Sequence, residues 1–412
     1  MKRVLAVFVT AAALVAPAPL AAAGPAVVGP VDLVGELDGA PFEIRVPADW
    51  NGTLVLYAHG YRDRADHAGE TDDRSVSAFA NDATEQAMLA AGYAIAGSAY
   101  SVNGWAVREG IHDMRALAAH FRHVVAKPER TLLAGFSMGS VVTLDSIEDL
   151  HGTYDGALAG CAVGAGAPLA FDATLAIATA YDAVFGWPAA WGTPADVRDD
   201  LDFDTEVLPV LIGQLTAPGG FAKFEFMRLV VGGPAGPEWP FSIWFFTTEG
   251  RAELERRAGG PVGQNADHTY SLSAADRARL AALGVSGATA DAWIADMMAN
   301  RVGPDRSARR YVERYAEYSG NIKDPVLTFD TTVDALVPAA HISVYNDTVR
   351  RPELVANAWT SGVGHCNFTV EQMVTAVTAL DEWVRTGVRP AGFPASQGFV
   401  DFTPPPWPQP TG

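Results

Sequence analysis

The chain has 412 residues, which is long enough for one large or two ordinary domains. Its composition, 49% hydrophobic and 19% charged residues, supports a substantial core. Its formal net charge is −19 at pH 7. Such an acidic chain repels phosphate backbones and anionic lipid surfaces, which argues against a nucleic-acid partner. Beyond the N-terminal segment, no run is long and apolar enough to span a bilayer, so we expect no integral membrane association.

The N-terminal segment has the pattern of a secretory signal peptide. Lys2 and Arg3 precede an apolar run over residues 4–15, and small residues end at Ala23. The run is too short for a membrane anchor. We therefore expect residues 1–23 to be removed and the mature protein to be secreted.

The sequence contains two cysteines, Cys161 and Cys366. In an oxidising compartment an even number favours one disulfide bond. Two buried free thiols are the alternative, because an unpaired cysteine packs as a small apolar side chain.

The first part of the chain alternates between strand and helix patterns. Strands are predicted on both sides of a turn at Asp38-Gly39, and a nearly continuous apolar run predicts a buried central strand. The predicted strands cover residues 31–33, 42–46, 53–57, 93–98, 131–136 and 158–163, and the predicted helices cover 81–91, 114–125 and 140–150. This alternation is typical of a mostly parallel sheet with helices on both faces.

The alternation stops between about residues 170 and 320, where aromatic side chains concentrate, and resumes with predicted strands at 325–329 and 354–359. A final helix opens with the capping box Thr369-x-x-Gln372. We predict one α/β core interrupted by a mainly helical cap; a separate binding domain is the alternative, although the core resumes immediately after it. The predicted parts are residues 24–169 (core), 170–320 (cap), 321–395 (core) and 396–412 (a Pro-rich tail that is loose and extended over 403–412).

The segment Gly135-Phe136-Ser137-Met138-Gly139 has the form G-x-S-x-G and follows a predicted strand. In this motif a strand turns sharply into a helix and exposes the hydroxyl of the central serine. Glycines are needed because a Cβ at either position would crowd the turn. The motif predicts that Ser137 is the nucleophile of a serine hydrolase.

A serine hydroxyl needs a neighbouring base, and the base needs an orienting carboxylate. After such an elbow the acid comes first in the chain and the histidine second. Asp334 and His365 each follow a predicted strand, so both fall in loops at the carboxyl ends of strands. We predict the triad Ser137, Asp334 and His365.

Other residues compete for these roles. Asp330 lies closer to the strand end, and Asp324 precedes the strand and belongs at the opposite edge of the sheet, whereas Asp334 has the loop length to reach an imidazole. His365 has the expected place in chain order and a glycine-rich approach. Its rivals as the base are His59, His112, His120, His123 and His341.

Two backbone N–H groups are predicted to bind the negative oxygen that forms on an attacked carbonyl. Met138 begins a helix whose N-terminus favours negative charge, and Tyr61 follows the third strand in His59-Gly60-Tyr61. His59, Tyr100 and Trp105 are predicted to lie at the substrate pocket, with simple packing an equal alternative for Trp105. The cap aromatics either line a substrate tunnel or form the core of the cap.

Ordered motifs between residues 59 and 369 resemble the α/β-hydrolase superfamily, in particular secreted bacterial serine esterases with an inserted cap. The matching segments are His59-Gly60-Tyr61, Tyr100-Ser101 with Gly104-Trp105-Ala106-Val107, the elbow at Ser137, Asp334 before Val337-Pro338, and Gly364-His365-Cys366-Asn367-Phe368-Thr369. The resemblance implies the α/β-hydrolase fold and the triad given above.

Some tannase and feruloyl-esterase relatives bridge a cysteine beside the serine to one beside the histidine. Phe136 occupies the serine-adjacent position here, so that bridge cannot form. We expect Cys366 to pair with Cys161 instead and to pin the histidine loop over the sheet.

The leading prediction is a secreted serine carboxylesterase that acts on a small-molecule or polymeric ester through an acyl-enzyme, with no metal and no organic cofactor. A secreted peptidase or amidase with the same triad is the alternative, and an aminopeptidase would use cap carboxylates such as Glu249, Glu253 or Glu255 to bind an amine. A binding protein on an inactive hydrolase scaffold is a third possibility, against which the complete triad argues. Acyl and alcohol preferences depend on cap geometry and do not follow from the sequence.

Overall fold

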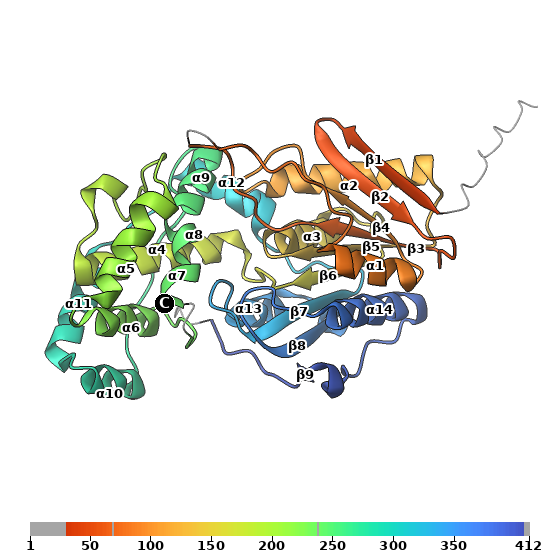
Figure 1. Cartoon of the computed structure of the whole chain (residues 1–412). Helices are drawn as coiled ribbons and strands as arrows, with labels where there is room; N and C mark the ends of the chain where they lie inside the picture. Colours follow the sequence, from red (N-terminus) through yellow and green to blue (C-terminus); the bar gives the residue numbers. More distant parts are fainter. Residues whose placement is uncertain (1–29, 68–69, 237–238, 408–412) are drawn as a thin grey trace, which may run out of the picture.

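The structure, a computed structural model, describes residues 30–67, 70–236 and 239–407 (Figure 1). The predicted signal peptide lies outside the described residues. No helix in the part of the chain that is described is both long enough and apolar enough to cross a membrane.

A sheet of nine strands forms one half of the described molecule (Figure 1). The six central strands run parallel to one another, while the two strands at one edge and the single strand at the other edge pair antiparallel. In order across the sheet they are β1 (Val31–Leu37), β2 (Ala40–Val46), β4 (Ala94–Ser98), β3 (Thr53–Ala58), β5 (Arg130–Phe136), β6 (Gly156–Gly160), β7 (Val326–Val333), β8 (Val355–Val363) and β9 (Phe399–Val400).

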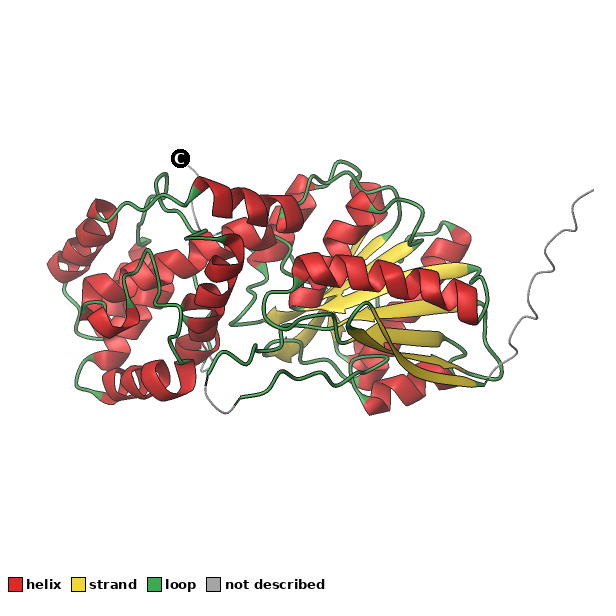
Figure 2. Ribbon diagram, turned by 90° about the horizontal axis from the view of Figure 1, so that it is seen from above, coloured by secondary structure: helices red, strands yellow, loops and turns green. Residues whose placement is uncertain are grey.

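Helices cover both faces of this sheet (Figure 2). They are α1 (Asp82–Ala90), α2 (Val107–Val124), α3 (Met138–Asp149), α13 (Ala340–Thr348) and α14 (Val370–Thr386). Side chains on β3 alternate between the two layers: Leu54 and Leu56 pack in the cluster that includes α2 and α3, and Val55 and Tyr57 in the cluster that includes α1 and α14. Both faces of the central strands are therefore buried, as their continuous apolar pattern predicts.

The chain between β6 and β7 is mostly helical, and we call residues 166–316 the helical insertion. Its helices are α4 (Gly166–Phe185), α5 (Leu208–Thr216), α6 (Gly220–Val230), α7 (Trp239–Ser242), α8 (Trp244–Thr247), α9 (Glu249–Ala258), α10 (Ala274–Ala282), α11 (Gly287–Ala299) and α12 (Arg306–Ala316), with a 3₁₀ turn at Ala189–Trp191 and a π turn at Phe203–Val207. The side chains of Ser273, Ser286 and Asp305 cap three of these helices. The insertion has an apolar core of its own, in which Tyr181 and Trp244 are fully buried.

Several element boundaries differ from the prediction. The strand predicted over 158–163 ends at Gly160, because Cys161 adopts a positive φ of 41° and turns the chain away. The strand predicted to end at residue 329 continues to Val333, where it still pairs with β8, so Asp330 lies inside the strand. These shifts decide which acidic side chain reaches the histidine.

The Pro-rich tail was predicted to be loose, and its described part does not support this. The Phe402 ring packs 4.8 Å from the Trp359 ring, and the Trp407 ring lies 4.9 Å from the ring of His341. Ser343 donates a hydrogen bond to the carbonyl oxygen of Pro405. The tail follows the surface back to the cavity described below because its aromatic side chains bury against the core.

Candidate active site

Ser137 stands on a sharp turn between β5 and α3. Its φ of 57° and ψ of −126° are strained for a residue with a Cβ. A Cβ on Gly139 would overlap the carbonyl oxygen of Ala58, and a Cβ on Gly135 would overlap that of Gly139. The close approach of these backbone segments therefore requires both glycines of the motif.

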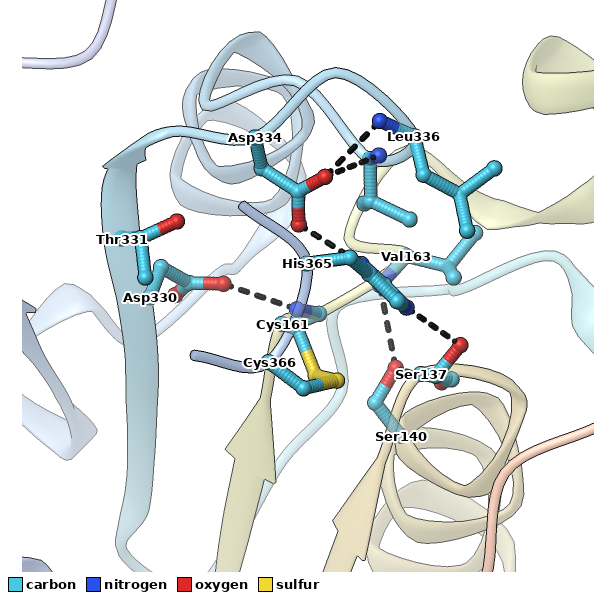
Figure 3. Close-up of a disulfide and its surroundings, with 12 residues drawn as sticks. Ser137, Ser140, Cys161, Val163, Asp330, Thr331, Asp334, Leu336, His365 and Cys366 are labelled. Atoms are coloured by element: carbon cyan, nitrogen blue, oxygen red, sulfur yellow. Dashed lines mark hydrogen bonds and ion pairs between the residues drawn. A yellow bond between two sulfur atoms is a disulfide. The ribbon is translucent and has the colours of Figure 1, made fainter. Parts of the chain in front are cut away.

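A second serine anchors this turn. Ser140 Oγ donates to the carbonyl oxygen of Ser137 at 2.6 Å and accepts from the N–H of Val163 at 3.0 Å (Figure 3). The elbow is thus tied to the loop after β6. Sequence reasoning missed Ser140, although a helical hydroxyl three residues after a carbonyl is a recognisable signal for such a bond.

Three side chains from three separate loops meet in a line. His365 Nε2 lies 2.7 Å from Ser137 Oγ, and His365 Nδ1 lies 2.7 Å from Asp334 Oδ2 (Figure 3). Asp334 Oδ1 accepts from the backbone N–H groups of Leu336 at 2.8 Å and Val337 at 2.9 Å. A carboxylate beside Nδ1 favours the tautomer with its proton there, which leaves Nε2 to accept the serine proton.

Asp330 and Asp324, the competing acids, are not at the histidine. Asp330 Oδ1 accepts instead from the N–H of Ala162 at 2.7 Å (Figure 3). Burial raises the pKa of the Asp330 carboxyl to about 8, so this group is mostly protonated at neutral pH. Asp324 precedes β7, at the opposite end of the strand from the loop that carries Asp334.

A disulfide bond joins Cys161, at the end of β6, to Cys366, next to His365, which confirms the predicted pair. Both cysteines have a positive φ, 41° and 52°. The same loop is held by Thr331, whose hydroxyl donates to the carbonyl oxygen of Gly364 at 3.0 Å. The loop of His365 is therefore fastened to β6 and to β7.

The segments that carry the two predicted oxyanion donors both adjoin the elbow. Met138 is the first residue of α3, at its N-terminus. A Cβ on Gly60 would lie 3.9 Å from Ser137 Oγ, so the loop that continues into Tyr61 passes close to the hydroxyl. The Tyr61 ring points into the helical insertion, with centroids 5.5 Å from Phe245 and 5.2 Å from Phe246.

A largely apolar cavity opens beside Ser137. Its walls come from α4, from the segment between α6 and α8, from the loop after β7 and from the tail; they include Trp105, Phe171, Trp239, Phe246 and Trp407. Of the residues that the structure describes, no lysine or arginine lines it. The aromatics of the insertion thus divide, because some line this cavity while Tyr181 and Trp244 form the core of the insertion.

The prediction for the pocket residues is partly wrong. Trp105 lines the cavity, but His59 and Tyr100 do not. Their rings stack on each other with centroids 3.9 Å apart, and the Tyr100 hydroxyl donates to the carbonyl oxygen of His59 at 3.1 Å. Burial lowers the pKa of His59 to about 4, so the ring is neutral. Both residues support the loop before Gly60 from inside.

The other histidines proposed as the base are placed elsewhere. His112, His120 and His123 lie on α2. His341, on α13, is 4% exposed and lines the cavity, and its Nδ1 accepts from the N–H of Ala165 at 3.2 Å. Burial lowers its pKa to about 3.

The strand order and the sharp strand-to-helix turn after β5 give the chain the α/β-hydrolase fold. No family model matches the chain. A stretch of 130 residues is 30% identical to o-phthalyl amidase of Xanthobacter agilis and covers 31% of this chain and 26% of that protein, so the match spans about a quarter of the relative.

Similar solved structures carry hydrolase names. They include a lipase in an open form (15% identity, TM-score 0.40, 86% of this chain and 98% of that one) and an esterase from Aspergillus oryzae (13%, 0.38, 87% and 80%). An acylaminoacyl peptidase of Pyrococcus horikoshii is 10% identical with a TM-score of 0.43, over 89% of this chain and 43% of that one. At these values the likeness assigns no activity to this chain.

Proposed function

We propose that the protein is a secreted serine hydrolase that cleaves carboxylic esters. The observation that carries this proposal is the unbroken line of two 2.7 Å contacts from Ser137 through His365 to Asp334. The site is accessible as well, because the side chain of His365 is 22% exposed and Ser137 lines a cavity. The N-terminal signal pattern and the disulfide are consistent with an oxidising compartment.

Each residue has a role in the proposed mechanism. Ser137 Oγ attacks the ester carbonyl while His365 Nε2 accepts its proton, and Asp334 stabilises the resulting imidazolium through Nδ1–H. The N–H groups of Met138 and Tyr61 stabilise the oxyanion. His365 then protonates the departing alcohol, and a water molecule activated by the same imidazole hydrolyses the acyl-enzyme.

We also propose that residues 170–320 act as a cap that selects the substrate. Support comes from the cavity, because helices of the insertion supply much of its apolar wall, including Phe171, Ile177 and Trp239. An apolar cavity with few polar groups suits an ester with an apolar or aromatic body.

Amide hydrolysis by the same triad is the second candidate, favoured by the local similarity to o-phthalyl amidase. An aminopeptidase fits less well, because two of the three acidic groups suggested for amine binding are engaged in ion pairs. Glu253 pairs with Arg257 at 2.9 Å and Glu255 with Arg251 at 2.8 Å, and neither carboxylate lines the cavity.

Replacing Ser137 by alanine tests the proposal. We expect Ser137→Ala to lower kcat for p-nitrophenyl butyrate by about 10⁴-fold or more, with an unchanged melting temperature. Ser271→Ala, an exposed serine of the insertion, is the control and should hydrolyse the ester normally. A fluorophosphonate probe should label the wild type and not Ser137→Ala. Full activity of Ser137→Ala would refute the proposal, and the corresponding p-nitroanilide separates esterase from amidase activity.

A further inference from the structure

His341 occupies a place in the cavity that the triad does not explain. It lies in the first turn of α13, downstream of the loop that holds Asp334, and its ring packs edge-on against Trp407 of the tail. It is 4% exposed and lines the same cavity as Ser137. Because Ser137 Oγ is paired with His365 and not with His341, this buried histidine is suited to binding the substrate.

The position of its proton follows from one hydrogen bond. The backbone N–H of Ala165 donates to His341 Nδ1 at 3.2 Å. Since that nitrogen accepts, the proton of the neutral imidazole is on Nε2. Burial keeps the ring neutral, with a pKa lowered to about 3 despite the nearby Asp334 carboxylate. His341 is therefore a hydrogen-bond donor through Nε2–H near neutral pH.

The chemistry of the walls narrows what this donor can bind. Apart from indole groups, the polar side chains that line the described cavity are Ser137, Thr174 and His341. The Thr174 hydroxyl already donates to the carbonyl oxygen of Phe171 at 2.9 Å. No lysine or arginine lines the described walls, so a carboxylate would lose its hydration without gaining an opposite charge.

We propose that His341 is a specificity-determining residue whose Nε2–H donates to a neutral oxygen on the apolar part of the substrate. The oxygen belongs to an ether, a ketone or a second ester, at a distance from the scissile carbonyl. This inference rests on the proposed function of Ser137. The hydrogen bond gives selectivity because a substrate without the oxygen leaves the buried Nε2–H donor unpaired.

Matched esters test the proposal. One series is p-nitrophenyl hexanoate and its analogues in which one methylene of the acyl chain is replaced by an ether oxygen; a second places the oxygen in the alcohol of an acetate ester. We expect the wild type to favour at least one oxygen position over its methylene parent by about tenfold in kcat/KM, about 1.4 kcal/mol. An analogue ending in a carboxylate should be a poorer substrate than the parent.

Two variants separate donation from structural support. His341→Asn keeps an acceptor for Ala165 near the position of Nδ1 but does not reach into the cavity, so the ratio of oxygen to methylene ester should fall to about one. His341→Gln loses that acceptor but places an N–H near the position of Nε2, so it should retain part of the ratio. A purely structural role would instead change both esters equally and make Gln the more damaging replacement. His268→Asn, a buried histidine outside the cavity, should keep the wild-type ratio.

The outcomes distinguish the two proposals. If the wild type hydrolyses no ester of either series, the proposed function fails and the inference fails with it. If it hydrolyses the esters without preferring any oxygen position, or if His341→Asn keeps the preference, the inference alone is overturned. Should His341→Asn not fold, the wild-type position scan and the ratio for His341→Gln decide the matter.

Discussion

The loops that carry Ser137, Asp334 and His365 and the helical insertion that walls the cavity are held together differently. In the loops, directional bonds predominate: the Ser140 hydroxyl holds the elbow and the disulfide holds the histidine loop. In the insertion, aromatic side chains pack into a core, as where the Tyr181 ring lies 5.1 Å from the Trp244 ring, and ion pairs such as Arg251 with Glu255 surround it. The catalytic loops are thus held by directional bonds and a covalent bridge, whereas the cavity wall that the insertion supplies consists of packed apolar side chains.

This difference indicates how the two regions respond to change. A hydrogen bond depends on the distance and the angle between one donor and one acceptor, whereas apolar packing tolerates volume-conserving substitutions. Changes in the loops should therefore alter kcat. Changes in the cavity walls should alter KM and the range of substrates.

After the loss of the nucleophile itself, the largest effect is expected when the acid of the triad is changed. Asp334→Asn should lower kcat for p-nitrophenyl butyrate by about 10³- to 10⁴-fold, because the amide favours the wrong imidazole tautomer. Asp330→Asn is the matched control, since Asp330 bonds to Ala162 and not to His365, and it should change kcat less than about threefold. Equal losses in the two variants would mean that the acid has been misassigned.

The next effect tests the covalent fastening of the histidine loop. The double variant Cys161→Ser, Cys366→Ser should lose about 2–5 kcal/mol of unfolding free energy, measured by urea denaturation. Its kcat should fall too, because the loop of His365 then loses its covalent link to the end of β6. Dithiothreitol should reproduce both losses in the wild type and leave the double variant unchanged. A wild type whose stability and kcat both resist complete reduction would contradict this role.

The contrast between the regions also explains how much could be predicted from sequence. The elbow motif identifies Ser137 and its two glycines because backbone atoms approach too closely there for a Cβ. Strand and helix periodicity gives the α/β class and most elements of the sheet. The catalytic roles remain a prediction, but the pairing of Cys161 with Cys366 is confirmed.

Other features depend on contacts between distant segments, and no local pattern reports them. His59 and Tyr100 follow strands in the way that pocket residues do, yet their rings turn inward and stack. Trp407 belongs to a proline-rich stretch that is typical of a loose tail, and only its contact with His341 places it at the cavity. Which ring nitrogen of His341 carries the proton likewise depends on the N–H of Ala165, which is far away in sequence.

A smaller effect is expected at the contact that joins the insertion to the core. Glu253 on α9 accepts from the N–H of Trp105 at 2.7 Å and is 2% exposed. Glu253→Gln should lower the unfolding free energy by about 1–3 kcal/mol and raise KM, because a buried charged hydrogen bond is weakened beside a cavity wall. Asp291→Asn breaks an exposed ion pair with Arg277 and should cost less than about 1 kcal/mol. Similar costs for both would exclude a special role for Glu253.

Asp330 also allows a prediction of pH dependence. Its pKa is raised from 3.8 to about 8 in the folded protein, so the native state binds the proton more tightly than the unfolded chain. The stability this provides is complete below pH 3.8 and is lost as the pH rises through about 8. Over that pH range, the unfolding free energy of the wild type should fall relative to that of Asp330→Asn. The difference between the two falls should exceed about 1 kcal/mol. Parallel curves would show that the carboxyl is ionised in the folded protein.

The smallest effect is expected at the tail, which contacts both the cavity and the outer surface of the core. Trp407 lines the cavity, whereas Phe402, five residues earlier, packs against Trp359 outside it. Both Trp407→Ala and Phe402→Ala should loosen the tail, but only Trp407→Ala should enlarge the cavity. We expect it to raise KM for short acyl esters by about threefold, less than 1 kcal/mol, and to shift the optimum towards longer chains. Identical chain-length profiles for the two variants would show that the tail rests on the surface without shaping the site.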